Sequence, residues 1–249
     1  MTDKERKDIL RAYAKQYETE KFLQGDPSWF MHHVEGRENQ EAMAFLASCL
    51  SYGSRKQFMP KIQWLLERSG GRVDKWIRNG SFENDLSCSN HECYYRLYTC
   101  RQMNLLLRSY RQMLDSYGTM GEYIAKESTD GITAIEALTR HFNSSSDNSG
   151  IIPKDTKSAC KRICMFLRWM VRGDSPVDLG LWADFIDRRT LVMPLDTHVL
   201  QQSVRLGLLS SRTATMSTAV RLTKALAEVF PDDPLKGDFA LFGYGVNQD

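Results

Sequence analysis

Short segments with helical periodicity recur along the chain, and they constrain its fold more than any other feature of the sequence. The clearest of them, Ser158–Arg172, reads SACKRICMFLRWMVR, with apolar residues every three or four positions. Breaks such as Gly70-Gly71 separate these segments. No two stretches show the alternating polarity of convincing strands. The sequence therefore predicts an all-α fold with about ten helices.

Two stretches in the middle of the chain carry further predictions. Apolar side chains recur at helical spacing from Tyr94 to Tyr117, which predicts one or two helices. Residues 143–150 read NSSSDNSG, and such a cluster of small polar residues indicates an exposed loop or linker.

Composition excludes several classes of protein. The chain has 249 residues, and none of its apolar runs approaches the roughly 18 residues of a membrane span, so we expect no membrane partner. The net charge of +2 is too small to indicate nucleic acid by itself. The six cysteines contain no C-x-x-C pair, so we expect no zinc site, and no motif requires a metal or an organic cofactor. Cys49 and Cys164 fit buried free thiols, and we expect a cytoplasmic protein.

The segment Met193–Leu200 reads MPLDTHVL and combines an extended approach with a helix start. Pro194 disfavours helical geometry at Met193, and Asp196 stands where an N-cap belongs, before a helix to about Leu206. A carboxylate fixed at a helix start has a defined direction. Capping and catalysis are compatible roles for Asp196, because a cap uses one oxygen and leaves the other free.

The helix Ser158–Arg172 has a cationic stripe. Lys161, Met165, Arg168 and Arg172 fall within about forty degrees of one another on a helical wheel. One interpretation is a solvated face. The other is a lysine held among arginines, where neighbouring cations disfavour the ammonium form and favour a nucleophilic amine.

Four patches resemble segments of the helix-hairpin-helix DNA glycosylases and follow one another along the chain in the same order as in that superfamily. PLDTHVLQQSVRLGL is similar to the segment with the catalytic aspartate, and FLASCLSY to an early helix that ends in S-x-Q. KRICMFLRWMV and DFALFGYGV are similar to the lysine-bearing helix and the C-terminal segment of the archaeal 8-oxoguanine glycosylase branch. The chain also looks like a bacterial family that carries the same MFLRWMVR and PLDTHV runs.

The resemblance implies roles for individual residues. Asp196 would stabilise the developing sugar cation and activate the nucleophile, and Lys161 would form a Schiff base at C1′ and allow strand cleavage. An alternative alignment places Arg162 at the lysine position, and an arginine cannot act as an amine nucleophile at ordinary pH. Asp238 would line the base pocket, although its simplest role is the N-cap of the last helix.

Further candidate substrate contacts are Arg162, Arg168, Arg172, His198 and Gly53. Gly53 stands where the glycosylases carry a glutamine, and no L-P-G-V-G hairpin precedes Lys161. The lesion and the oligomeric state are left open by the sequence.

The resemblance also implies an organisation. We expect a single glycosylase-like unit over residues 1–249, with a middle helical subdomain at about 40–172, a second formed by 1–39 and 173–249, and a cleft between them. The expected function is a DNA repair glycosylase and lyase that excises a damaged base, an oxidised purine among the candidates, from duplex DNA. The alternatives are a module of the same fold that binds nucleic acid without cleaving it, a protein-interaction module, and an enzyme that acts on a small nucleoside.

Overall fold

The computed structural model describes residues 1–87 and 92–247, and this part of the chain is mostly helical, with one small two-stranded sheet. The all-α prediction is therefore confirmed for the described residues. The chain divides into two compact units, which are described separately. Unit 1 comprises residues 1–24, 129–135 and 156–249, and unit 2 comprises residues 25–128 and 136–155.

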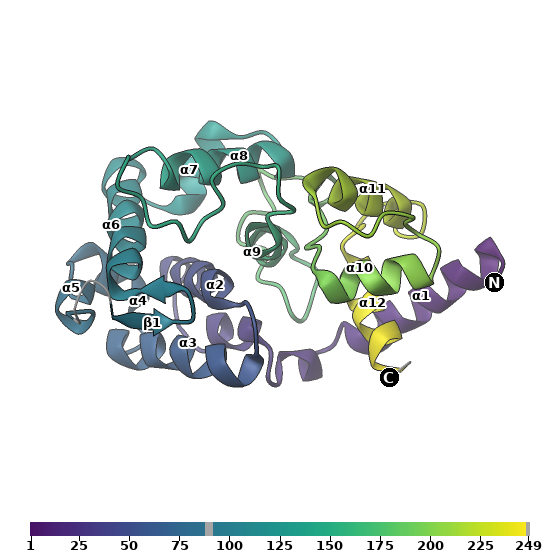
Figure 1. The fold of residues 1–249 in the computed structure, drawn as a ribbon, viewed down its shortest axis with the longest axis horizontal. Coiled ribbons are helices and arrows are strands. Elements are labelled where there is room, and N and C mark those ends of the chain that lie inside the picture. Colours follow the sequence, from purple (N-terminus) through teal and green to yellow (C-terminus); the bar gives the residue numbers. More distant parts are fainter. Residues whose placement is uncertain (88–91, 248–249) are drawn as a thin grey trace. The chain divides into compact units, whose positions relative to one another are not determined.

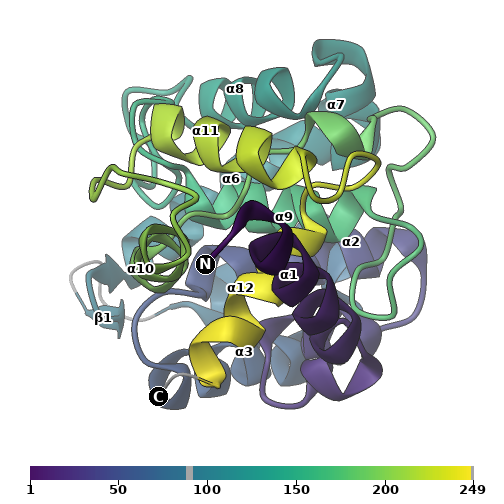
Figure 2. The same cartoon turned by 90° about the vertical axis from the view of Figure 1, so that its right-hand side faces the viewer.

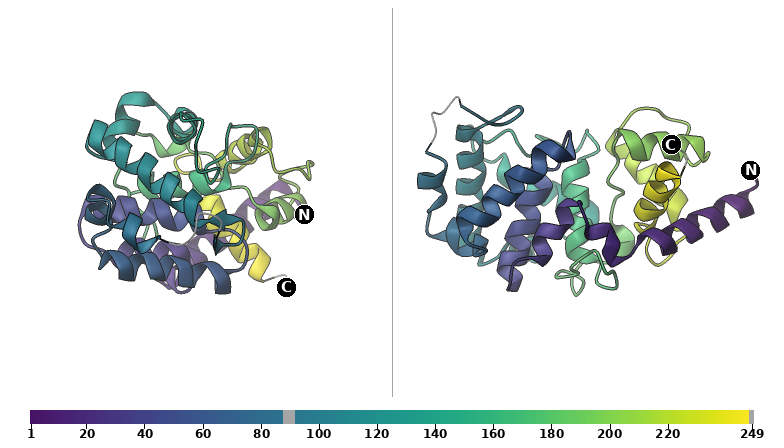
Figure 3. Two further views of the ribbon diagram at one scale, coloured as in Figure 1. Left: turned by 60° about the vertical axis from the view of Figure 1, so that its left-hand side comes forward. Right: turned by 90° about the horizontal axis from the view of Figure 1, so that it is seen from below.

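Unit 1 is built around helices from both ends of the chain. Its elements are α1 (Asp3–Tyr17), η1 (Glu20–Leu23), the start of α8 (Gly131–Phe142), α9 (Lys161–Val171), η3 (Arg188–Thr190), α10 (Thr197–Arg205), α11 (Met216–Ala227) and α12 (Lys236–Val246). The N-terminal α1 and the C-terminal α12 lie side by side (Figures 1, 2 and 3). Aromatic rings such as Tyr17 and Phe242, with centroids 5.6 Å apart, join the two helices.

Unit 2 surrounds a buried helix. Its elements are η2 (Pro27–His32), α2 (Arg37–Leu50), α3 (Arg55–Ser69), α4 (Val73–Arg78), α5 (Phe82–Asp85), β1 (Cys93–Tyr95), β2 (Tyr98–Thr99), α6 (Cys100–Tyr117), α7 (Met120–Glu127) and the rest of α8. Helix α2 is buried from Glu41 to Leu50, because its small and apolar side chains let neighbouring elements pack on most of its faces. Phe45 of α2 stacks on Phe142 of α8, with ring centroids 5.0 Å apart.

The prediction of a helix that begins at Tyr94 is wrong. Strands β1 and β2 pair antiparallel there, and α6 begins only at Cys100. Tyrosine and threonine side chains suit a pleated strand, and Arg96 adopts a left-handed φ of 53° in the turn between the strands. Thr99 then caps α6, because its hydroxyl accepts a hydrogen bond from the Gln102 backbone N–H at 3.2 Å.

Other sequence predictions agree with the structure. Residues 143–150 form a loop, and Cys49 and Cys164 are buried free thiols. Among residues 1–87 and 92–247, none of the helices combines the length and the apolar composition that a membrane crossing needs.

The segmentation into units can be compared with the expected subdomains. The sequence prediction assigned residues 156–172 to the middle subdomain, whereas here they cluster with the two chain ends in unit 1. Arg172 at the end of α9 bonds Glu18 and Asp233, which ties this helix to both chain ends. The expected cleft between subdomains stays a prediction.

Candidate active site

Asp196 uses its two carboxylate oxygens for two different contacts. Oδ1 accepts a hydrogen bond from the Val199 backbone N–H at 2.9 Å and so caps α10. Oδ2 lies 3.6 Å from the Lys161 Nζ. The predicted cap is confirmed, and the oxygen that it leaves over faces an amine.

Lys161 is the first residue of α9, and its amine is accessible. The residue before it, Cys160, adopts a left-handed φ of 45° that turns the chain into the helix. The side chains of Lys161 and Asp196 are 32% and 40% exposed. Half-exposed ion pairs contribute little to stability, so this pair has a small structural role and both groups can meet a ligand.

Asp238 is the third group of the site, although it does not cap its helix as its simplest role predicted. Helix α12 begins at Lys236, which places Asp238 inside the first turn, where it bonds the Arg168 guanidinium. Burial raises the pKa of the Asp238 carboxyl, and the charge of Asp196 adds to this, whereas Arg168 and Lys161 act in the opposite direction. Asp238 therefore lies within electrostatic reach of both Asp196 and Lys161.

The solvated-face interpretation of the α9 stripe is wrong for its two arginines. The side chains of Arg168 and Arg172 are only 4% and 1% exposed. Arg168 bonds Asp178 and Asp238, and Arg172 bonds Asp178 and two further carboxylates. Buried charges need such partners, and each of these guanidinium groups bonds at least two carboxylates, whereas their predicted contact with a substrate stays a prediction.

Burial and charge act against each other in this network. Burial lowers the pKa of Arg172, but Asp178, Asp233 and Glu18 together hold it above its ordinary value. Burial raises the pKa of the Asp178 carboxyl, although Arg168 and Arg172 lower it. Lys161 is thus not held among unpaired arginines, because carboxylates surround both of them.

The remaining predicted residues lie in different places. Arg162 is half-buried beside Lys161, but it is Lys161 that pairs with Asp196. His198, half-buried on α10, lies against Gly245 of α12, where an added Cβ would come within 2.3 Å of the imidazole Nε2. Gly53 belongs to unit 2 and has a φ of +81°.

Sequence reasoning missed the β1–β2 turn next to Gly53. The Arg96 guanidinium lies against Gly53 and above the Tyr52 ring, 5.4 Å from its centroid. Leu97 follows at the tip with 81% of its surface exposed, and its backbone N–H donates to the Tyr52 hydroxyl at 3.2 Å. The signal in the sequence is Arg96-Leu97 between Tyr94-Tyr95 and Tyr98-Thr99, two pairs of residues that favour strands.

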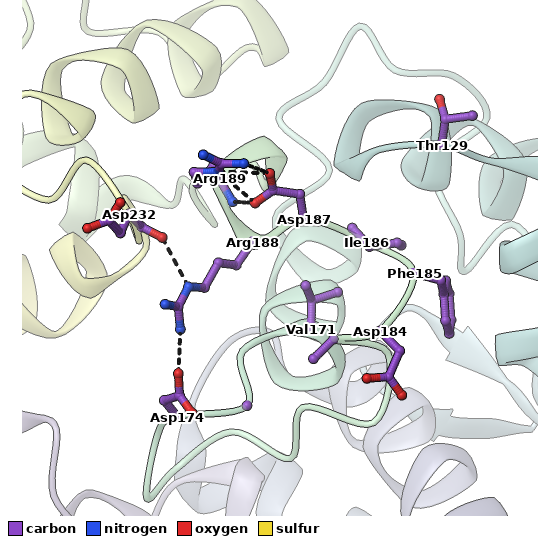
Figure 4. Close-up of a pocket in the computed structure, with 12 residues that line it drawn as sticks. Thr129, Val171, Asp174, Asp184, Phe185, Ile186, Asp187, Arg188, Arg189 and Asp232 are labelled. Atoms are coloured by element: carbon purple, nitrogen blue, oxygen red, sulfur yellow. Dashed lines mark hydrogen bonds and ion pairs between the residues drawn. The ribbon is translucent and has the colours of Figure 1, made fainter.

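A cavity of about 770 Å³ at the other end of α9 is a poor alternative site (Figure 4). It includes Val171, which is ten residues and so about 15 Å along the helix from Lys161. Arg188 bonds Asp174 and the Asp232 carbonyl, and Arg189 bonds Asp187. Four aspartates against two arginines give the lining a formal charge of −2, which disfavours a phosphate.

No metal cluster is evident in the part of the chain that the structure describes, residues 1–87 and 92–247, where no group of three His, Cys, Asp or Glu side chains could hold an ion.

Comparison with known proteins gives one family. The family described as Protein of unknown function (DUF2400) matches residues 26–247, a range that contains Lys161, Asp196 and Asp238. No curated protein and no solved structure matches the chain.

Proposed function

The chain belongs to the DUF2400 family, and we propose that it is a DNA repair glycosylase and lyase that removes a damaged base from duplex DNA. The observation that carries this proposal is the pair formed by the Lys161 amine and the Asp196 carboxylate, 3.6 Å apart and both accessible. The cap fixes the direction of the Asp196 carboxylate, and Lys161, the first residue of α9, places its amine beside it. An amine next to a fixed carboxylate suits attack on a sugar carbon that develops positive charge.

The proposed reaction uses these two groups in sequence. Asp196 accepts the proton of the Lys161 ammonium, and the free amine attacks C1′ of the damaged nucleotide. The bond between C1′ and the base nitrogen breaks, and the base leaves with the electron pair and takes up a proton. Ring opening gives a Schiff base between Lys161 and the sugar. Loss of a proton from C2′ then expels the 3′ phosphate and cuts the strand, and water releases the sugar from Lys161.

The positions of Lys161 and Asp196 also support a helix-hairpin-helix glycosylase fold, the finer fold that we propose for this all-α chain. The nucleophile opens one helix and the carboxylate caps another, as the resemblance implies. We assign Asp238 to the base pocket, and the influence of the Asp196 and Lys161 charges on its carboxyl supports this assignment. An oxidised purine is the candidate lesion, because the lysine-bearing and C-terminal segments are most similar to the 8-oxoguanine branch.

The β1–β2 turn of unit 2 supports DNA as the partner. Leu97 is exposed, and Arg96 is beside it. Apolar side chains of this kind can insert between stacked bases, while a neighbouring arginine binds phosphate. The basic side chains of Lys61 and Arg68 lie over the aromatic rings of Tyr94 and Trp64, on or next to α3. Aromatic and basic side chains in alternation are typical of nucleic-acid surfaces.

A nucleic-acid-binding protein of the same fold without catalysis is the second candidate. The observation that favours it is the segment before Lys161, where Ser158 pairs with Thr215 in place of a glycine-rich loop that would present N–H groups to a phosphate. Such a protein would bind DNA through the β1–β2 turn and leave it intact.

The substitution Asp196→Asn separates the two candidates. Asparagine can still cap α10, but it cannot accept the lysine proton or stabilise a cation. We expect the wild type to release a base from at least one duplex in a panel of damaged bases, and we expect Asp196→Asn to lose this activity while it still binds DNA. Equal activity of the variant and the wild type would exclude the proposed mechanism.

Salt dependence of binding tests the shared premise of both candidates. Phosphate contacts release counterions, so the binding constant should fall steeply as salt rises. A binding constant that does not change with salt would argue against both candidates and favour a protein-interaction module.

A further inference from the structure

One side of α3 in unit 2 carries basic and aromatic side chains in a row. Lys61, Trp64 and Arg68 recur at helical spacing and fall within about sixty degrees of one another on a helical wheel. The Lys61 Nζ lies 5.0 Å from the ring centroid of Tyr94 in β1, and the Arg68 guanidinium lies 5.6 Å from that of Trp64. The Trp64 and Tyr94 rings meet edge to face with centroids 5.8 Å apart. These four residues form the α3 face.

The two cations of the α3 face are not neutralised by carboxylates. In the part of the chain that the structure describes, neither Lys61 nor Arg68 forms an ion pair, whereas Arg108 of the same unit pairs with Glu83. The one acidic residue of α3, Glu67, accepts a hydrogen bond from a glutamine of its own helix instead. Arg68 is exposed and Lys61 is half-buried, so both charges are available to an anionic partner.

The α3 face and the β1–β2 turn lie on opposite sides of β1. Successive residues of a strand point to opposite sides. Tyr94 contacts α3, whereas the ring of Tyr95 lies 5.1 Å from the ring of Tyr52, which is also the ring under Arg96. The α3 face is therefore a surface of its own and not an extension of the turn.

The composition of the α3 face fits an unpaired strand of DNA. Bases stack on aromatic rings and phosphates bind cations, but a base offers its flat face only where it is not already stacked in a duplex. A duplex or an acidic peptide would use the two cations and leave the half-exposed Trp64 without a partner. The row from Lys61 to Arg68 is about 10 Å long, which corresponds to about three nucleotides at about 3.4 Å each.

We propose that the α3 face binds single-stranded DNA, with bases stacked on Trp64 and phosphates bound by Lys61 and Arg68. Tyr94 supports this face from below, because it is buried and its hydroxyl donates to the Lys61 carbonyl at 3.2 Å. The inference rests on the proposed function for its setting, since base excision and strand cleavage in a duplex leave nucleotides without a paired base.

Two residues of unit 2 outside the α3 face provide matched controls. Trp29 is half-buried like Trp64, and its ring stacks on a histidine with centroids 3.4 Å apart. Arg108 is exposed like Arg68, but its guanidinium is paired with a carboxylate. The substitutions Trp29→Leu and Arg108→Gln therefore repeat the chemical changes of Trp64→Leu and Arg68→Gln at other places on the same unit.

The experiment titrates a short fluorescein-labelled oligothymidylate with the full chain and its variants, and it follows fluorescence anisotropy at several salt concentrations. Trp64→Leu should weaken binding about tenfold at unchanged salt dependence, because leucine removes the ring but no charge. Arg68→Gln should reduce the slope of log binding constant against log salt by about 0.7, the contribution of one phosphate contact on a single strand. Trp29→Leu and Arg108→Gln should bind as the wild type does.

The size of the loss in Trp64→Leu on different partners decides the inference. A tenfold loss on oligothymidylate and a smaller loss on an undamaged duplex of the same length, with both controls unchanged, support it. Equal losses on the two nucleic acids, no loss on oligothymidylate, a loss of the same size in Trp29→Leu, or displacement by polyglutamate at equal charge overturns it. If Trp64→Leu does not fold, Arg68→Gln decides, and a salt slope equal to that of Arg108→Gln overturns the inference.

This titration and the test of the proposed function fail independently. Oligothymidylate contains no damaged base, so a negative titration leaves the Asp196→Asn test of base release untouched. Absence of base release would in turn leave the titration unaffected, because binding to the α3 face needs no chemistry at Lys161.

Discussion

Replacement of Arg172 by methionine should destabilise unit 1 strongly. The guanidinium bonds Glu18, Asp178 and Asp233, and the methionine would fill much of its volume but leave Glu18 and Asp233 without this counter-charge and Asp178 with Arg168 alone. Removing one partner of a buried ion pair costs about 3–5 kcal/mol of unfolding free energy. For a chain of this length, that cost lowers the melting temperature by about 10 °C.

The pH dependence of the Arg172→Met variant should identify the cause. Asp178 has a folded-state pKa above its unfolded value, so the folded state binds more protons between the two, and stability rises as the pH falls through this interval. Loss of Arg172 removes one of the charges that oppose this shift. The stability deficit of the variant should therefore be smaller at about pH 5.5 than at about pH 7.5.

Urea unfolding of the wild type and Arg172→Met at these two pH values measures the loss of unfolding free energy and its change with pH. Arg188→Met is the control, because Arg188 pairs with the exposed Asp174 and should change stability by less than about 1 kcal/mol. An unfolding free energy of Arg172→Met within about 1 kcal/mol of the wild type, the range of a surface ion pair, would contradict the buried role of Arg172. A stability deficit that grows as the pH falls would contradict the effect of Arg172 on the pKa of Asp178.

Three further substitutions test separate features. Leu97→Ser should weaken binding to duplex DNA about tenfold in a fluorescence titration at unchanged melting temperature, because burial of a leucine is worth about 1.5 kcal/mol or more, whereas Leu97→Met should bind as the wild type does. Gly245→Ala should cost about 1–3 kcal/mol in urea unfolding, since its Cβ would overlap the His198 ring, and an unchanged midpoint would contradict this contact. Glu41→Gln should cost about 1–2 kcal/mol in the same assay, because the Glu41 carboxylate accepts the N–H groups of two residues at the start of α7, and equal stability would show that this cap is dispensable.

Local features of the sequence predicted the parts of the site that depend on local structure. Asp196 was predicted as a helix cap because a proline approach and a following apolar pattern lie within a few residues of it. Lys161 was predicted within the first turn of a helix because an apolar pattern of helical period runs from Ser158 to Arg172. Their proximity came from the order of the patches and the resemblance, since no local rule joins residues thirty-five positions apart.

The carboxylates that cover the cationic stripe of α9 could not be predicted from the sequence. A helical wheel shows that Arg168 and Arg172 share a face, but it does not show what covers that face. Asp233 lies 61 residues after Arg172, and Glu18 lies 154 residues before it. These contacts exist only because the two chain ends and α9 pack into one unit.

The β1–β2 turn was missed for a different reason. Apolar residues at 94, 97 and 98 fit a helical period as well as a short hairpin, so periodicity alone could not decide. The left-handed Arg96 decides in favour of the hairpin, and a non-glycine residue in that conformation has no signature in a single sequence.

Borohydride trapping on a damaged duplex tests the proposed nucleophile most directly. Reduction of a Schiff base would join the protein to the sugar, and digestion with mass spectrometry would locate the bond. We expect one adduct, on Lys161, which is lost in Lys161→Ala and kept in Arg162→Ala. An adduct on another residue, or base release by Lys161→Ala at the wild-type rate, would contradict it.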